Sequence, residues 1–277
     1  MVGANKALVP ADKYLYALRD VTATVNSIPL IASSIMSKKL ASGVDGIVLD
    51  VKAGSGAILR TERESLELAQ AMVRVCTLAG KPVIALLSGM DQPLGTHVGN
   101  ALEVKEAIDL LSGRAGGDLL EVSLMLGSYM LQLAGKADSD EAGREMLKEA
   151  LESGRGLDKL RQMVTAQGGD PAVCDDVGRL PQAPVIRTMR CEQAGAVIRM
   201  NTAALGLAAQ AMGAGRLRKE DPIDPAVGFI LKVRIGDRVT PETVLCELHA
   251  RTEADADRAA RAIRAASSYS TFSLPTP

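Results

Sequence analysis

Several residue types that commonly carry chemistry are scarce in this sequence. Tryptophan is absent and aromatic residues make up only 2% of the 277 residues, so a stacking platform for single-stranded nucleic acid has little to be built from. There are only two histidines, His97 and His249. This count excludes a histidine-rich metal site and disfavours a Ser-His-Asp triad. Any chemistry must therefore rest on other side chains.

Excess charge, cysteine and long apolar runs are also missing. Lys and Arg number 32 against 33 for Asp and Glu, so nothing attracts the chain generally to nucleic acid or anionic lipid. The four cysteines are too few and too widely spaced for a disulfide framework or metal-ligand pairs. We find no apolar run near the roughly 18 residues that span a bilayer, and no secretion signal at the start. We therefore expect a cytoplasmic protein with a small-molecule partner, not nucleic acid or membrane.

The chain is long enough for about two packed domains, and 47% of its residues are hydrophobic, as in an ordinary globular protein. Residues 46–51, GIVLDV, predict a buried strand, and residues 62–79 predict an amphipathic helix that ends at Gly80. A second buried strand follows at residues 81–87. This order predicts a parallel crossover and an α/β fold with a mainly parallel sheet and flanking helices.

The remaining segments differ in their predicted secondary structure along the chain. Residues 11–44 predict two helices interrupted near Pro29, and the middle of the chain up to residue 166 is mostly helical. From Cys191 onward, short strands with turn signals predict a small C-terminal α+β module. We place domain boundaries after residues 44 and 188, end the module at residue 266, and expect a frayed tail over 267–277.

The first candidate site lies in the two N-terminal helices. Ser34 and Lys38 are four residues apart, so a hydroxyl and an ammonium project from one helix face, and Arg19 adds a planar donor fork. Set among apolar residues, these donors suit a polar ring such as a pyrimidine, whose carbonyl oxygens accept hydrogen bonds. The alternative is that Arg19 and Lys38 are solvated surface charges and Ser34 fills the helix.

Two further segments allow both structural and functional interpretations. The loop at residues 52–56, KAGSG, follows a strand; a tight turn explains its glycines, whereas Lys52 stays open as an anion ligand. Residues 91–106 connect a strand to a helix for which Asn100 is a candidate N-cap with Glu103 at the third position. Carboxylates in this segment could instead bind a monovalent cation together with loop carbonyls.

Five ordered blocks, spread over nearly the whole chain, resemble the thymidine phosphorylase and pyrimidine-nucleoside phosphorylase family. They are YALRDVTATVNSIPLIASSIMSKK at 16–39, DVKAGSGA at 50–57, QPLGTHVGNALEVKEA at 92–107, MVTAQGGDP at 163–171 and GAGRLRKEDPIDPAVG at 213–228. The order and extent of these blocks are far more specific than any single motif. The resemblance therefore favours the functional interpretation of the donors near the N-terminus.

The resemblance implies that Arg19, Ser34 and Lys38 hydrogen-bond the pyrimidine base, with Arg19 and Lys38 also stabilising it as a leaving group. The apolar positions that it implies around the base are Val25, Ile31 and Ile58. The implied reaction is reversible phosphorolysis, in which phosphate attacks C1′ of a pyrimidine nucleoside or deoxynucleoside. No organic cofactor is implied, because phosphate is a co-substrate.

The resemblance also implies a potassium ion held by the carbonyls of Leu94 and His97 and the carboxylate of Glu106, and a homodimer. Residues 1–44 then correspond to a remnant of the family's helical lobe. The glycine-rich segment and the phosphate-holding residues that the family places before this point are not found in the sequence. We therefore expect an N-terminally truncated enzyme that is inactive alone. A catalytically silent binding subunit and a phosphorylase of nucleoside monophosphates are the alternatives.

Overall fold

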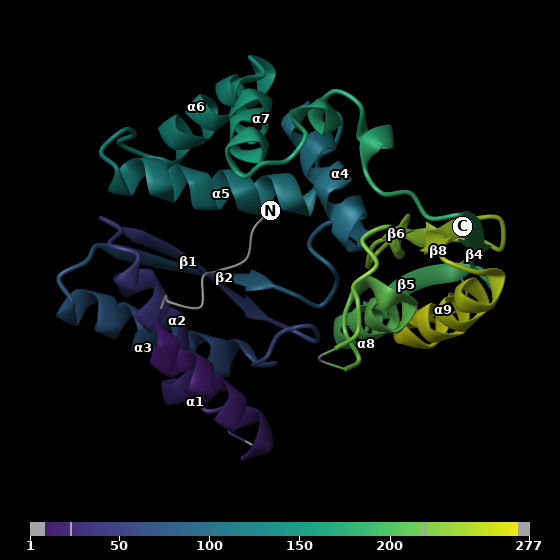
Figure 1. The fold of residues 1–277 in the computed structure, drawn as a ribbon, viewed down its shortest axis with the longest axis horizontal. Helices are drawn as coiled ribbons and strands as arrows, with labels where there is room; N and C mark the ends of the chain where they lie inside the picture. The colour runs from purple at the N-terminus through teal and green to yellow at the C-terminus, as the bar shows by residue number, and fades with distance from the viewer. Residues whose placement is uncertain (1–8, 23, 219, 271–277) are drawn as a thin grey trace, which may run out of the picture.

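The computed structural model describes residues 9–22, 24–218 and 220–270, and it confirms the α/β class (Figure 1). In the first part of the chain, a small sheet lies between helices on both faces: α2 and α3 cover one face and α5 covers the other. These elements are α1 (Pro10–Val21), α2 (Ile28–Ala41), β1 (Ile47–Ala53), α3 (Glu62–Leu78), β2 (Val83–Gly89) and α5 (Asp118–Leu133).

The sheet in this part is parallel, as the strand-helix-strand order predicts. Ile47 of β1 faces Val83 of β2, and the register runs without a shift to Ala53 and Gly89. The helix between them starts cleanly because Thr61 and Glu64 form a reciprocal capping box. In the described part of the chain this parallel sheet has two strands, smaller than the mainly parallel sheet that we expected.

The core beneath this sheet explains why β1 alternates in burial. Ile47, Leu49 and Val51 are buried in one cluster with side chains of α2 and α3, whereas Asp50 and Lys52 point to the opposite face. Because α2 contributes buried residues to this cluster, the segment expected to be a remnant of a separate lobe packs directly on the α/β core. Residues 1–8 of that segment lie outside the described residues.

The middle of the chain is helical, as expected. It comprises α4 (Asn100–Leu111), α5, α6 (Asp140–Glu152), α7 (Arg155–Ala166) and two 3-10 turns, η1 (Pro171–Cys174) and η2 (Val177–Arg179). Figure 1 shows α6 and α7 stacked on the outer side of α5, with α4 leading toward the C-terminal module.

The C-terminal module is built from antiparallel strands and two helices around a second core. Its elements are β4 (Val185–Arg190), β5 (Gly195–Met200), α8 (Thr202–Ala209), the π-helical turn η3 (Gln210–Ala214), β6 (Gly228–Leu231), β7 (Arg238–Val239), β8 (Val244–Ala250), α9 (Glu253–Ala266) and β9 (Ser267–Ser270). Strands β3 (His97–Val98), β6, β8 and β4 form one sheet, and β7, β5 and β9 form another. Phe229, fully buried, lies in the core between them and the helices.

Two expectations about this module need correction. Residues 267–270, which we expected in a frayed tail, form β9 and pair with β5, because backbone pairing outweighs their Ser-rich composition. Residues 271–277 lie outside the described residues. The boundary expected after residue 188 falls inside β4, whose partner is β8 of the module, so the structure puts the change of domain before Val185.

Within the described residues, no helix is both long and apolar enough to cross a membrane.

Candidate functional site

Ser34 and Lys38 meet on one face of α2, as their spacing predicts. The Lys38 ammonium donates hydrogen bonds to the Ser34 hydroxyl and to the Ser34 carbonyl, both at 3.1 Å. Ser34 is buried, whereas 44% of the Lys38 side chain is exposed. The pair is therefore fixed by the helix yet open to solvent on one side.

Asp12 belongs to the same cluster, although the sequence analysis did not identify it. Its carboxylate lies 2.6 Å from the Lys38 Nζ atom and is largely buried. Burial opposes ionisation of Asp12, but hydrogen bonds from Lys38 and Ser34 and the charges of Lys38 and Arg19 outweigh it, so the pKa of the carboxyl is lowered. The available signal was that Asp12 and Arg19 are seven residues apart, two helical turns on one face of α1.

Arg19 lies at the end of α1 and is 7% exposed. Its Nη2 atom donates to the Val25 carbonyl at 2.5 Å, and its Nη1 atom lies 3.5 Å from the Leu30 carbonyl. The guanidinium thus holds the connection between α1 and α2. This contact brings Arg19, Ser34, Lys38 and Asp12 together in one hairpin, which we call the α1–α2 hairpin.

A cavity of about 320 Å³ lies beside the α1–α2 hairpin, between α2 and the loop after β1. Two of the predicted apolar residues, Ile31 and Ile58, are among its lining residues, and Val25 is not. Ile31 is buried, and 61% of Ile58 is exposed. Arg19, Ser34 and Lys38 do not line this cavity either. The structure therefore places the apolar walls next to the donors and does not enclose both in one pocket.

The lysine of the KAGSG loop is engaged by two neighbouring strands. The Lys52 ammonium contacts the Asp50 carboxylate at 2.7 Å and donates to the Ser88 hydroxyl at 2.7 Å. Gly54 has a φ of +127°, and a side chain there would lie 2.8 Å from the Asp91 backbone nitrogen. Gly54 therefore has a structural role in the turn. The Lys52 ammonium is held by Asp50 and Ser88.

Glu106 accepts hydrogen bonds from the segment that the resemblance assigned to a cation. The Thr96 backbone N–H and hydroxyl donate to it at 2.6 and 2.8 Å, and the His97 backbone N–H donates at 3.3 Å. Burial opposes ionisation, but the His97 side chain and these donors lower the pKa of Glu106 to about 2. Glu106 is therefore a fully ionised carboxylate at neutral pH.

The carbonyl of Leu94 has a different partner, the guanidinium of Arg234 from the loop after β6. Arg234 donates to the carbonyls of Pro93, Leu94 and Gly95 at 2.6, 3.3 and 3.2 Å, and it pairs with Asp118 at 2.5 Å. A positive group thus already lies at Leu94. In the described residues, no group of three or more His, Cys, Asp or Glu side chains is placed to hold a metal ion.

Asn100 is not the N-cap that we expected. Gly99 is the cap of α4, and the Asn100 amide donates instead to the Ala214 carbonyl at 2.9 Å, because α4 begins one residue earlier than predicted.

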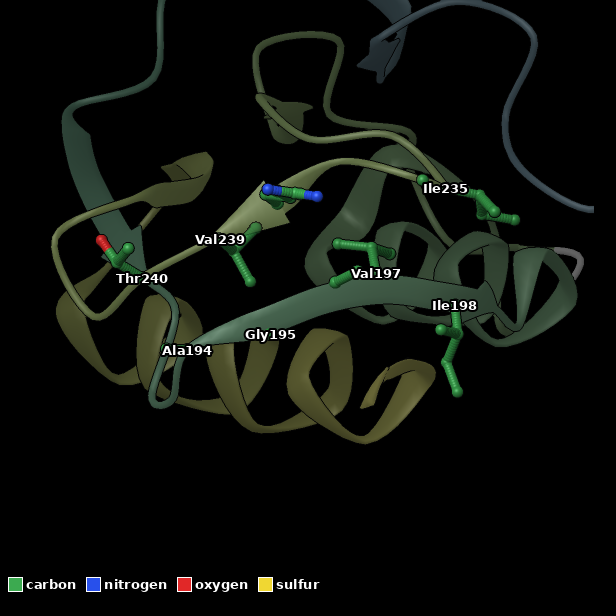
Figure 2. Close-up of a pocket in the computed structure, with 10 residues that line it drawn as sticks. Ala194, Gly195, Val197, Ile198, Ile235, Val239 and Thr240 are labelled. Atoms are coloured by element: carbon green, nitrogen blue, oxygen red, sulfur yellow. The ribbon is translucent and has the colours of Figure 1, made fainter. Parts of the chain in front are cut away.

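A second cavity, of about 710 Å³, lies in the C-terminal module between β5 and the loop that includes β7 (Figure 2). Most of its lining is apolar, with Val197, Ile198, Ile235 and Val239 among the lining residues. None of the predicted site residues lines it.

The α/β layers and the C-terminal module each match a domain of known proteins. Residues 1–157 match the glycosyl transferase family, a/b domain, and residues 196–270 match the pyrimidine nucleoside phosphorylase C-terminal domain. The chain belongs to this glycosyl transferase family.

The relatives of this chain include two bacterial pyrimidine-nucleoside phosphorylases. The chain is 50% identical over 253 residues to the pyrimidine-nucleoside phosphorylases of Bacillus subtilis (strain 168) and Staphylococcus aureus (strain USA300). These alignments cover 91% of this chain and 58% of each relative. The chain therefore spans somewhat more than half the length of the relatives that it matches.

Proposed function

We propose that this chain carries the base-binding half of a phosphorylase that cleaves pyrimidine nucleosides or deoxynucleosides with phosphate. The products are the free base and a pentose 1-phosphate. The observation that carries the proposal is the α1–α2 hairpin, in which Arg19, Ser34 and Lys38 gather beside a cavity lined by Ile31 and Ile58. The names of the two relatives, at 50% identity, support the same reaction.

The chemistry of this reaction suits the hairpin. As the glycosidic bond breaks, the base gains negative charge and the sugar gains positive charge. The positive charges of Arg19 and Lys38 then interact more strongly with the departing base than with the neutral nucleoside, which lowers the barrier. Ser34 adds a hydroxyl beside Lys38, and Val25, Ile31 and Ile58 supply apolar contacts for the ring. The Val25 carbonyl accepts a hydrogen bond from Arg19, so Val25 lies next to this donor.

Phosphate has no comparable set of ligands among the residues assigned above. Because the chain spans 58% of the relatives, we place the phosphate-holding groups in the part of the relatives that it does not match. Phosphate is a co-substrate and no organic cofactor is required. The chain alone should then bind a base without cleaving a nucleoside.

The potassium ion implied for Leu94, His97 and Glu106 has its own test. Arg234 lies at the Leu94 carbonyl, so the arrangement described above does not favour a second cation there. Thermal melts in potassium and choline chloride separate the cases: a Tm that rises only with potassium, and not in Glu106→Gln, supports the ion. Equal Tm values in the two salts would contradict the potassium ion.

We also propose a homodimer and a cytoplasmic location. All four cysteines are free thiols and are buried, which suits a reducing compartment. Sedimentation of the purified chain tests the dimer.

The function is tested by measuring release of thymine or uracil from thymidine or uridine in the presence of phosphate. The assay uses a protein that joins the unmatched part of the Bacillus subtilis relative to this chain, which we call the joined protein. Phosphate-dependent release supports the proposal. Base binding with no release would favour a silent binding subunit, and cleavage only of nucleoside monophosphates would favour the nucleotide enzyme.

A further inference from the structure

Asp12 is a buried charged residue of the α1–α2 hairpin to which we have assigned no role. Its carboxylate is 10% exposed and contacts the Lys38 ammonium at 2.6 Å. The Ser34 side chain also helps to lower the pKa of this carboxyl. One carboxylate therefore contacts Lys38 and interacts with Ser34, the two residues of α2 that are proposed to contact the base.

These contacts fix the direction of the Lys38 ammonium. A lysine has three N–H donors, and here its acceptors are the Asp12 carboxylate, the Ser34 hydroxyl and the Ser34 carbonyl. A long side chain that is 44% exposed would otherwise sample many rotamers, and ordering it on binding would reduce affinity. The contact with Asp12 limits this freedom before any ligand arrives.

A purely structural role explains Asp12 less well. An ion pair whose lysine is 44% exposed is a poor way to hold two helices together, because solvent and salt screen the attraction between its charges. The Asp12 carboxylate also interacts with both cations, Lys38 and Arg19, and its negative charge reduces the repulsion between them. It thus allows two positive groups to face one small ligand.

We propose that Asp12 is a positioning residue of the base site, which holds Lys38 in the geometry that receives the carbonyl edge of a pyrimidine. This inference rests on the proposed function. Asp12 acts through Lys38 and does not touch the base. Its removal should therefore weaken base binding only while Lys38 is present.

The test measures the affinity of the 277-residue chain for thymine and uracil by calorimetry or ligand-observed NMR. Four proteins form a double-mutant cycle: the unaltered chain, Asp12→Asn, Lys38→Met and the double variant. We expect Asp12→Asn to weaken binding by about tenfold in the presence of Lys38, the factor that corresponds to losing a charged hydrogen bond. In the Lys38→Met background, the same change should alter affinity less than about twofold.

Asp109→Asn is the matched control, because it breaks an exposed ion pair with Arg114 at 2.8 Å on another helix, and it should bind base like the unaltered chain. Asp12→Ser, which keeps an acceptor without the charge, replaces Asp12→Asn if that variant does not fold. An ammonium-selective ¹H–¹⁵N spectrum provides an independent readout, since the slowly exchanging signal that Lys38→Met removes should also disappear in Asp12→Asn.

The outcomes separate this inference from the function on which it rests. If the unaltered chain binds neither thymine nor uracil, the base-site assignment fails and this role fails with it. If the unaltered chain binds base and Asp12→Asn binds equally well or more tightly, the function stands and the positioning role is wrong. Equal losses in both backgrounds of the cycle would make Asp12 a structural residue only.

Discussion

At the scale of single residues, Arg19 and Lys38 are the two cations that we propose for base recognition. Losing a charged donor to a bound polar group costs about 1.5 to 3 kcal/mol. In the joined protein, Arg19→Ala or Lys38→Ala should therefore lower kcat/KM for thymidine by roughly tenfold or more. Steady-state kinetics of thymine release measures this, with the exposed Arg238→Ala as the control. Unchanged kinetics in both variants would remove the base-site assignment.

Glu106 provides a second prediction, on stability against pH. Its folded pKa of about 2 lies below the ordinary value of 4.5, so its stabilising contribution is complete above pH 4.5 and is lost as the pH falls toward 2. Between pH 7 and pH 3, this loss amounts to about 2 kcal/mol in the free energy of unfolding. Urea unfolding at the two pH values should show a smaller difference in Glu106→Gln than in the unaltered chain.

The control for Glu106 is Glu145→Gln, which alters an exposed carboxylate on α6 paired with Lys148. It should leave the pH dependence of unfolding close to that of the unaltered chain. A Glu106→Gln variant that loses stability with acid as steeply as the unaltered chain would show that the contacts with residues 96 and 97 do not hold the carboxylate ionised.

At the scale of elements, the loop between β2 and β3 is held by a residue from the far end of the chain. Arg234 donates to three consecutive carbonyls of this loop and pairs with Asp118 at the start of α5. Arg234→Met keeps the apolar stem and leaves these acceptors without their donor. It should destabilise the protein by about 2 kcal/mol or more.

Hydrogen exchange is the sharper measurement for Arg234. In Arg234→Met, we expect faster exchange of the backbone N–H groups of residues 94–97, with little change in α3 on the other side of the sheet. Uniform acceleration throughout the chain would indicate global destabilisation, and unchanged exchange would show that Arg234 does not hold the loop.

The sequence predicted the elements whose signals are local. The run GIVLDV and the helix after it appear within two residues of their expected positions, because burial alternation and a capping box act over a few residues. Strand β4 was not predicted, since its pairing depends on β8, more than fifty residues later. Helix α9, though amphipathic, was also missed, because its alanine-rich apolar face gives a weak signal beside short strands.

The same distinction applies to the candidate site. The Ser34 and Lys38 pair is visible from its helical spacing, Arg19 could be named beside it as a donor fork, and the resemblance gave all three residues a role. Asp12 required knowledge of how α1 folds back onto α2, and Arg234 required contacts across about 140 residues. Single-sequence patterns do not report such contacts. The residues that the sequence analysis missed are therefore those that position others.

At the scale of the whole molecule, we propose that the reaction needs both this chain and the part of its relatives that it does not match. Positioning phosphate beside C1′ lowers the activation barrier by several kcal/mol. The residues that we assign to the base site do not position phosphate. Apolar residues such as Leu15 and Leu30 of the α1–α2 hairpin are exposed. We expect this surface to be covered in the joined protein.

Whether the apolar surface of the α1–α2 hairpin is covered in the joined protein can be measured without an activity assay. Binding of an apolar fluorescent dye should be higher for the 277-residue chain than for the joined protein, and Leu15→Ser should lower it in the chain alone. Equal dye binding by both proteins would show that the unmatched part of the relative does not cover this surface.

The most direct test of the central claim is the phosphate-dependent release of thymine from thymidine, measured for the purified chain and for the joined protein under the same conditions. The account predicts no appreciable turnover by the chain alone and turnover by the joined protein. Turnover by the chain alone at roughly 1 per second or above, the rate of ordinary enzymes, would contradict it, because phosphate would then be held by residues of this chain.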